Sequence, residues 1–166
     1  MEKLKIFELN HKFNVTDNIK NMLDKEDFIL LKEVGIPTKI LSNTFVYYES
    51  LIVEGDCLVL GFNNHVPAWT LKISLVDKSV FYSGKGDFSE HVYCFYNTSL
   101  SKLLLSILSY EFFMCRLINS NFIGNYHEYH ERYAILLNDL ISDIDIEATK
   151  QGAWFSLISE MKLGVI

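Results

Sequence analysis

The stretch WTLKISL, residues 69–75, decides the fold class of this chain. Apolar side chains stand at every second position from Trp69 and polar ones lie between them, so the pattern predicts a β-strand with one face in a core and the other in water. The dipeptide Asp77-Lys78 then separates this strand from the run 80–82. That spacing predicts a tight hairpin, although Lys78 is not an ideal residue for a backbone position with positive φ.

Further short runs of β-branched and aromatic residues extend the predicted sheet in both directions. Residues 45–48 and 57–60 precede the hairpin, bounded by the turn 54–56 and by Gly61, and residues 92–96 follow it. Runs of this kind between turn residues are typical of strands. We therefore expect an antiparallel meander in the middle of the chain.

Two short helices are predicted before the sheet. Asp17 or Asn18 is placed to cap the first, which runs to Leu23. The second covers residues 26–34 and is expected to stop at Gly35, because a proline follows two residues later.

Three helices are predicted after the sheet. Asn97 or Thr98 is placed to cap a run, residues 100–113, that is apolar around most of its circumference and is therefore expected to be nearly buried. A tyrosine- and leucine-bearing stripe over residues 126–140 predicts an amphipathic helix that covers the sheet from outside. The last helix, residues 154–161, is stopped by Gly164. The thin polar stripe expected on the first of these helices consists of Ser99, Lys102, Ser106 and Ser109.

Strands in sequence order, with helices before and after them, indicate an α+β fold with a mainly antiparallel central sheet flanked by N- and C-terminal helices. A length of 166 residues and a hydrophobic content of 49% suffice for one sizeable core. We therefore treat residues 1–166 as a single domain. The 12 Phe, 9 Tyr and 2 Trp exclude a disordered chain.

Composition also indicates in which compartment the chain acts and which classes of partner it disfavours. The formal charge of −6 repels polyanions, so direct nucleic-acid binding is disfavoured. Three widely spaced cysteines, expected to be inert in apolar surroundings, indicate neither disulfides nor a zinc site and fit a reducing cytoplasm. No secretory signal opens the chain, and charges interrupt the most apolar window, residues 100–118, so no membrane span is expected.

Motifs for catalysis or metal binding are weak. His127 and His130 lie three apart on a predicted helix, but a zincin motif needs four, and no third ligand is evident, so we interpret this stretch as a solvated helix flank. Residues 84–87, GKGD, lack the length of a phosphate-binding loop and predict a hairpin or a connecting loop. His65 falls in a turn between strands and is expected at the surface. No catalytic residue, cofactor or metal is predicted.

Acidic residues at turns and strand ends are the candidate partner-binding positions, because together they form a field complementary to a basic protein surface. For any one of them, simple solubility is the competing interpretation. The six positions are Glu49, Glu54, Asp56, Asp77, Asp87 and Glu90.

Several short motifs resemble the SUKH superfamily, which is related to the yeast Smi/Knr regulators and the bacterial Syd protein. Residues 31–37, LKEVGIP, resemble its L-x-x-V-G-[IL]-P opening. Residues 97–100, NTSL, leading into an apolar helix, are similar to the fourth SUKH subfamily, as are Asp145 and Ala148 followed by Trp154. The resemblance spans about residues 24–164.

The resemblance implies an immunity protein that inactivates a cognate polymorphic toxin, of nuclease or deaminase type, by direct protein binding and without catalytic residues of its own. A second hypothesis is a Smi/Knr-like regulatory adaptor that binds a cellular protein. A third, from a different class, is a metal-dependent enzyme that uses His127 and His130.

Overall fold

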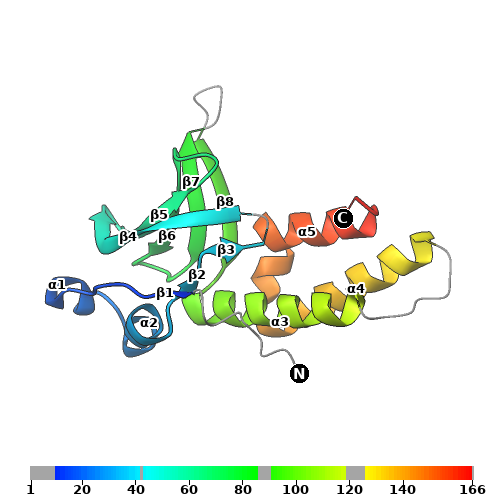
Figure 1. Ribbon diagram of the computed structural model, residues 1–166, viewed down its shortest axis with the longest axis horizontal. Helices are drawn as coiled ribbons and strands as arrows, with labels where there is room; N and C mark the ends of the chain where they lie inside the picture. The colour runs from blue at the N-terminus through cyan, green and yellow to red at the C-terminus, as the bar shows by residue number, and fades with distance from the viewer. Residues whose placement is uncertain (1–9, 42, 86–90, 119–125, 166) are drawn as a thin grey trace.

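The computed structural model describes residues 10–41, 43–85, 91–118 and 126–165 (Figure 1). It shows one α+β domain with a mainly antiparallel sheet, as the sequence predicts. The strands are β1 (Asn10–His11), β2 (Ile36–Pro37), β3 (Lys39–Ile40), β4 (Asn43–Glu54), β5 (Cys57–Asn63), β6 (Trp69–Ser74), β7 (Val80–Lys85) and β8 (His91–Asn97). The helices are α1 (Asp17–Lys20), α2 (Lys25–Ile29), the π-helix η2 (Leu30–Val34), α3 (Leu100–Ile118), α4 (Tyr126–Ile144), the 3₁₀ helix η3 (Ile146–Thr149) and α5 (Gly152–Lys162).

The main sheet has six strands in the order β3-β4-β5-β6-β7-β8, so each strand pairs with its neighbour in sequence and the predicted meander is confirmed. Strands β1 and β2 form a separate pair. In Figure 1, α4 and α5 lie to the right of the sheet and α3 runs below it, while α1 and α2 lie at the lower left. One hydrophobic core joins the sheet to the helices; its fully buried members include Leu31, Leu58, Leu71, Ile73, Leu103, Leu137 and Trp154.

The β6–β7 hairpin forms where the sequence predicts it. Lys78 adopts the left-handed conformation, with φ of 66°. The Asp77 carboxylate accepts hydrogen bonds from the backbone N–H and the hydroxyl of Ser79, at 3.1 and 2.8 Å. These bonds fix the turn, and they compensate for a lysine at a position that glycine or asparagine would occupy with less strain.

Gly61 is not the end of a strand, contrary to the prediction. Strand β5 continues to Asn63, and its pairing with β6 shifts register between Val59 and Gly61. A Cβ atom at Gly61 would lie only 2.3 Å from the carbonyl oxygen of Val46. The glycine therefore marks a bulge at which the β4 backbone approaches closely, a role that sequence alone does not distinguish from a turn.

The N-terminal helices are partly as predicted. Helix α1 begins at Asp17 with Thr16 in the N-cap position, so neither Asp17 nor Asn18 caps it, and it ends at Lys20 before reaching Leu23. The second predicted helix forms as α2 and η2, and it stops at Gly35, whose φ is 83°.

Helix α3 departs from the prediction in its cap and in its burial. Ser99 caps it, because the Lys102 backbone N–H donates to the Ser99 hydroxyl at 3.3 Å. The helix is not nearly buried: Leu105 and Phe112 are 51% and 50% exposed. Ser106, expected on the polar stripe, is fully buried and accepts a hydrogen bond from Asn97.

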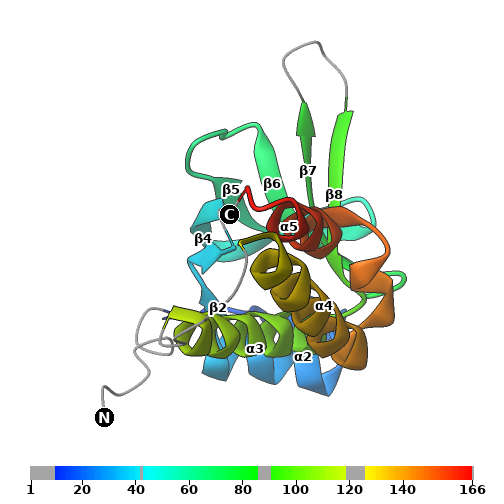
Figure 2. The ribbon, with the colours of Figure 1, turned by 90° about the vertical axis from the view of Figure 1, so that its right-hand side faces the viewer.

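Helix α4 does not cover the sheet from outside. It packs on α3, α5 and η3, and Figure 2 shows it between α3 and α5. Its buried stripe contains Ala134, Leu137 and Ile141 together with His130, which is 9% exposed. The interpretation of His130 as part of a solvated flank is therefore wrong, because two neighbouring helices enclose this side of α4. The terminal helix α5 forms as predicted, and Gly164 follows it with φ of 70°.

Candidate protein-binding face

The face of the main sheet that points away from the core carries two rows of directly paired residues. We call these ten residues the outer face. They alternate along each strand with core residues such as Leu71 and Ile73, which are fully buried. The first row runs Val46, Phe62, Thr70, Ser83 and Tyr93, and the second runs Ile52, Val59, Lys72, Phe81 and Phe95, both from β4 to β8.

The outer face is largely apolar, and solvent reaches part of it. Seven of its ten residues are aliphatic or aromatic, whereas the solvent side of an antiparallel sheet is ordinarily polar. Val46, Ile52 and Tyr93 are 41%, 42% and 58% exposed. Val59, Phe81 and Phe95 are 1%, 8% and 6% exposed, so the exposed apolar side chains lie at the β4 and β8 ends of the two rows. Exposed apolar side chains on a sheet are a candidate interaction site.

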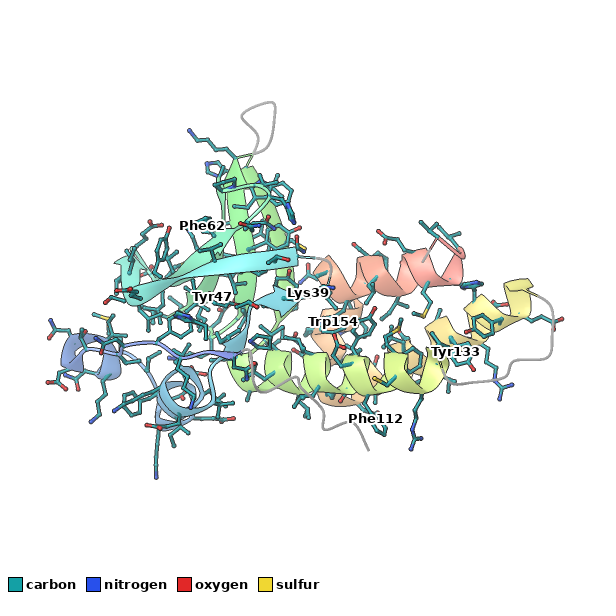
Figure 3. The ribbon with its side chains drawn as sticks, viewed as in Figure 1. Lys39, Tyr47, Phe62, Phe112, Tyr133 and Trp154 are labelled. Atoms are coloured by element: carbon teal, nitrogen blue, oxygen red, sulfur yellow. The ribbon has the colours of Figure 1, made fainter. Side chains whose placement is uncertain are left out.

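Two pairs of aromatic rings lie at opposite sides of the outer face. The Phe81 and Tyr93 rings lie 4.8 Å apart, centroid to centroid, at the β7–β8 side. On the β4–β5 side Phe62 lies 5.8 Å from the ring of Tyr48. Figure 3 labels Phe62 and also Tyr47, which belongs to the core row on the opposite side of the sheet. Thr70, Ser83 and Lys72 lie between the two aromatic pairs.

One cation lies in the centre of the outer face. The Lys72 ammonium is 3.1 Å from a carboxylate oxygen of Glu54, and the two side chains are 18% and 58% exposed. Because Glu54 neutralises Lys72, the outer face carries no unpaired positive charge of its own.

Three of the six acidic positions come together at one end of the sheet. The β4–β5 and β6–β7 turns lie at that end, joined by a 2.8 Å hydrogen bond from the Leu75 N–H to the Asp56 carbonyl. Glu54, Asp56 and Asp77 are exposed there. Hydrogen bonds from Ser74 and Ser79 lower the pKa of Asp77, so it stays charged. Glu49 is exposed within β4; Asp87 and Glu90 lie outside the described residues.

A buried polar network closes the other side of the fold, where β8 ends. Asp145 is 2% exposed, and its carboxylate accepts hydrogen bonds from the Thr98 N–H at 2.7 Å and from the Asn97 amide at 3.1 Å. The Lys102 ammonium lies 3.5 Å away. The indole N–H of Trp154 donates to the Asn97 amide oxygen at 2.9 Å.

This polar network links elements that are far apart in sequence through hydrogen bonds. It joins the end of β8 to the start of α3, to the residue before η3 and to α5. The residues 97–100, Asp145 and Trp154, which the sequence analysis singled out separately, therefore meet in one cluster. Satisfied buried networks of this kind fix a unique packing arrangement. Asn97 and Thr98 are not available as helix caps because Asp145 binds both.

A second buried carboxylate lacks such donors. Asp27 on α2 is 4% exposed, and within the described residues its Oδ2 has no hydrogen-bond partner. Desolvation and the nearby Asp24 carboxylate raise the pKa of Asp27 to about 6. Nothing in the sequence indicates this burial, since Asp27 stands in a polar first turn.

The remaining candidate residues are scattered. No group of three or more metal-ligating side chains is found among the described residues, and the His127 side chain lies outside them. His65 is exposed in the β5–β6 loop, as predicted. Cys94 is half-buried, and desolvation raises its pKa, but Cys115 is exposed, contrary to the expectation of an apolar setting. Gly84 and Lys85 end β7, which pairs antiparallel with β8 as in the predicted hairpin, while residues 86–87 lie outside the described part.

Sequence reasoning missed the outer face because it examined β6 alone, where Thr70, Lys72 and Ser74 form a polar side. The signal was present in the next strand: residues 57–63, CLVLGFN, are apolar at both odd and even positions. Such a strand has apolar residues on both faces, which indicates a second buried or binding surface.

Comparison with known proteins finds no similar protein. No protein-family model, curated protein or solved structure matches this chain. Among the described helices, none combines the length and the apolar character that crossing a membrane requires.

Proposed function

We propose that this chain is a cytoplasmic immunity protein of the SUKH type, which neutralises a cognate toxin by binding to it directly. The observation that carries the proposal is the outer face, an apolar and aromatic sheet surface that solvent reaches at its β4 and β8 ends. Exposed aromatic residues supply much of the energy at protein interfaces.

Charge supports the same class of partner. The chain carries a net charge of −6, and Glu54, Asp56 and Asp77 gather at one end of the sheet. Toxins that cleave or modify nucleic acids have basic substrate-binding surfaces, because they must bind polyanions. An acidic rim beside an apolar face accelerates association with such a surface and opposes dissociation once it is covered.

Co-expression with the toxin-like product of the neighbouring reading frame tests the proposal. We expect growth rescue and a stable complex that co-purifies in a 1:1 ratio. Absence of both with the wild-type chain contradicts immunity by binding and favours the regulatory-adaptor hypothesis.

A matched pair of variants locates the interface. Val46→Lys places a cation in the first row of the outer face and should weaken binding at least about tenfold. Ile135→Lys on α4 is the control, since Ile135 is 53% exposed and Val46 is 41% exposed. Equal effects of the two substitutions would show that the outer face is not the interface.

A further inference from the structure

We propose that the bound partner adds an extended strand to the free edge of β8, pairing with the backbone of His91 and Tyr93. This inference rests on the proposed function and specifies how the partner is held. It is carried by the direction of the backbone groups in β8, by the elements that cover the two edges of the sheet, and by the position of Tyr93 in the outer face.

The backbone direction follows from the hairpin next to β8. The Ser74 N–H donates to the Ser79 carbonyl across the β6–β7 turn. Hydrogen-bonded pairs alternate in an antiparallel ladder, so Phe81 and Ser83 direct their N–H and C=O groups toward β6, and Tyr82 and Gly84 direct theirs toward β8. Tyr82 pairs with Cys94 and Gly84 with Val92. The groups of His91, Tyr93 and Phe95 therefore point away from β7.

An independent contact confirms this direction. A Cβ atom at Gly152 would lie 2.0 Å from the Phe95 carbonyl oxygen. The start of α5 therefore occupies the outer side of β8 beside Phe95, which is where that carbonyl must point. Helix α5 closes the second half of the edge and leaves the first half, His91 to Cys94, without a neighbouring strand among the described elements.

Other segments of the chain cover the opposite edge of the sheet, formed by β4. Strand β3 pairs with the start of β4, and farther along the Asn14 N–H donates to the Glu49 carbonyl, while the His11 ring contacts the Tyr48 carbonyl at 3.2 Å. Natural proteins protect exposed edges with charges, prolines or covering segments. Strand β8 contains neither a charged residue nor a proline. Its first half has the properties of an edge that accepts a strand.

The chemistry of the edge identifies the occupant as an extended polypeptide segment of the partner. Two N–H and two C=O groups at alternate residues match the backbone of a strand. A second copy of this chain fits poorly, because each copy carries α5 on the pairing side beside Phe95. A single partner segment needs only to end before that point. Its side chain opposite Tyr93 would continue the first row of the outer face, Val46 to Tyr93.

Proline substitution separates edge binding from folding. Tyr93→Pro removes an N–H that points outward, so the purified chain should keep its melting temperature within a few degrees and bind the co-purifying toxin at least about 30-fold more weakly. Tyr93→Thr keeps the outward N–H but lacks the ring, so it reports the contribution of the side chain, and it should bind at least about tenfold more tightly than Tyr93→Pro. Cys94→Pro removes a ladder hydrogen bond to β7 and should unfold the chain, which checks the assigned direction.

Amide hydrogen exchange provides a measurement that needs no variant. The Tyr93 amide should exchange fast in the free chain and become protected in the complex. Slow exchange in the free chain, unchanged exchange in the complex, or wild-type binding by Tyr93→Pro overturns the edge proposal while leaving immunity by binding intact. A homodimer that Tyr93→Pro dissociates assigns the edge to a second copy and also overturns it. No complex with the wild-type chain overturns the proposed function itself.

Discussion

The two halves of strand β8 differ in what packs against them. The second half ends at Asn97, which is fully buried and binds Asp145, Ser106 and Trp154. The first half carries Tyr93, 58% exposed, and has no strand on its outer side in the described part of the chain. One strand therefore serves both as a structural anchor and as an exposed edge.

The difference shows how a small domain keeps an exposed strand edge rigid. The anchored half is held by charge-assisted bonds from backbone and side chains, which are the strong class of hydrogen bond. The open half inherits that rigidity through its ladder with β7 and needs no covering element of its own. Substitutions should therefore affect stability in the anchored half and binding in the open half.

Removal of the Asp145 carboxylate should have the largest effect. Asp145→Ala leaves the Thr98 N–H and the Asn97 amide without their acceptor in a buried site. We expect a loss of about 3–5 kcal/mol in the free energy of unfolding, measured by urea denaturation. Asp143→Ala, an exposed acidic neighbour on α4, is the control and should change stability by less than about 0.5 kcal/mol. A small effect of Asp145→Ala would show that the polar network does not stabilise the fold.

Asp27 is a buried carboxylate with fewer hydrogen-bond donors than Asp145, so a comparison of the two shows how much such donors stabilise a buried charge. Its pKa in the folded chain is about 6 and its ordinary value is 3.8, so the folded state holds the proton more tightly. The chain should be most stable with respect to this group below pH 3.8 and should lose that stability as the pH rises through 6.

The substitution Asp27→Asn removes this titration. It should raise the free energy of unfolding at pH 7 by up to about 3 kcal/mol and flatten its pH dependence between 4 and 7. Glu33→Gln, at an exposed position on η2 that does not contribute to the Asp27 pKa, is the control. An unchanged pH profile in Asp27→Asn would mean that other groups produce the dependence.

The indole hydrogen bond is expected to contribute less than the carboxylate. Trp154→Phe keeps most of a fully buried ring but removes the donor to Asn97. A loss of about 2 kcal/mol should follow, seen as a lower urea midpoint with an unchanged slope. Phe155→Leu on the exposed side of α5 is the matched change, because Phe155 is 49% exposed. Comparable losses in both variants would argue against the network.

The smallest effect is expected in the open half of β8. Tyr93→Thr retains a strand-forming residue and should cost less than about 1 kcal/mol, whereas Phe95→Thr, at a site 6% exposed, should cost about 3 kcal/mol or more. Thermal denaturation of the two variants side by side measures the contrast. Equal losses at the two positions would remove the distinction between the halves.

Local patterns in the sequence predicted the elements whose causes are local. The alternation over residues 69–75 identified β6, the spacing at Asp77-Lys78 identified the hairpin, and Gly35 identified the end of a helix. Each depends on backbone conformation or on a repeat over a few residues. The meander order followed because short connections join strands that are adjacent in the sheet.

Patterns that depend on distant partners were misread. The local pattern puts Ser106 on a thin polar stripe of α3, yet the Asn97 amide provides a buried partner for its hydroxyl. His130 was placed on a solvated flank, although α4 lies between two other helices. Asn97 and Thr98 have good capping side chains, but Asp145, 47 residues or more away, binds both of them.

The sequence by itself determined the fold class, the position of strands β4 to β8 and the acidic character of the chain, because periodicity, turn residues and charge are properties of neighbouring residues. Only the tertiary structure decided which apolar rows face solvent, which half of β8 is covered and which polar residues are buried. Those properties depend on what packs against each element, and contacts between residues far apart in the chain leave no local pattern to read.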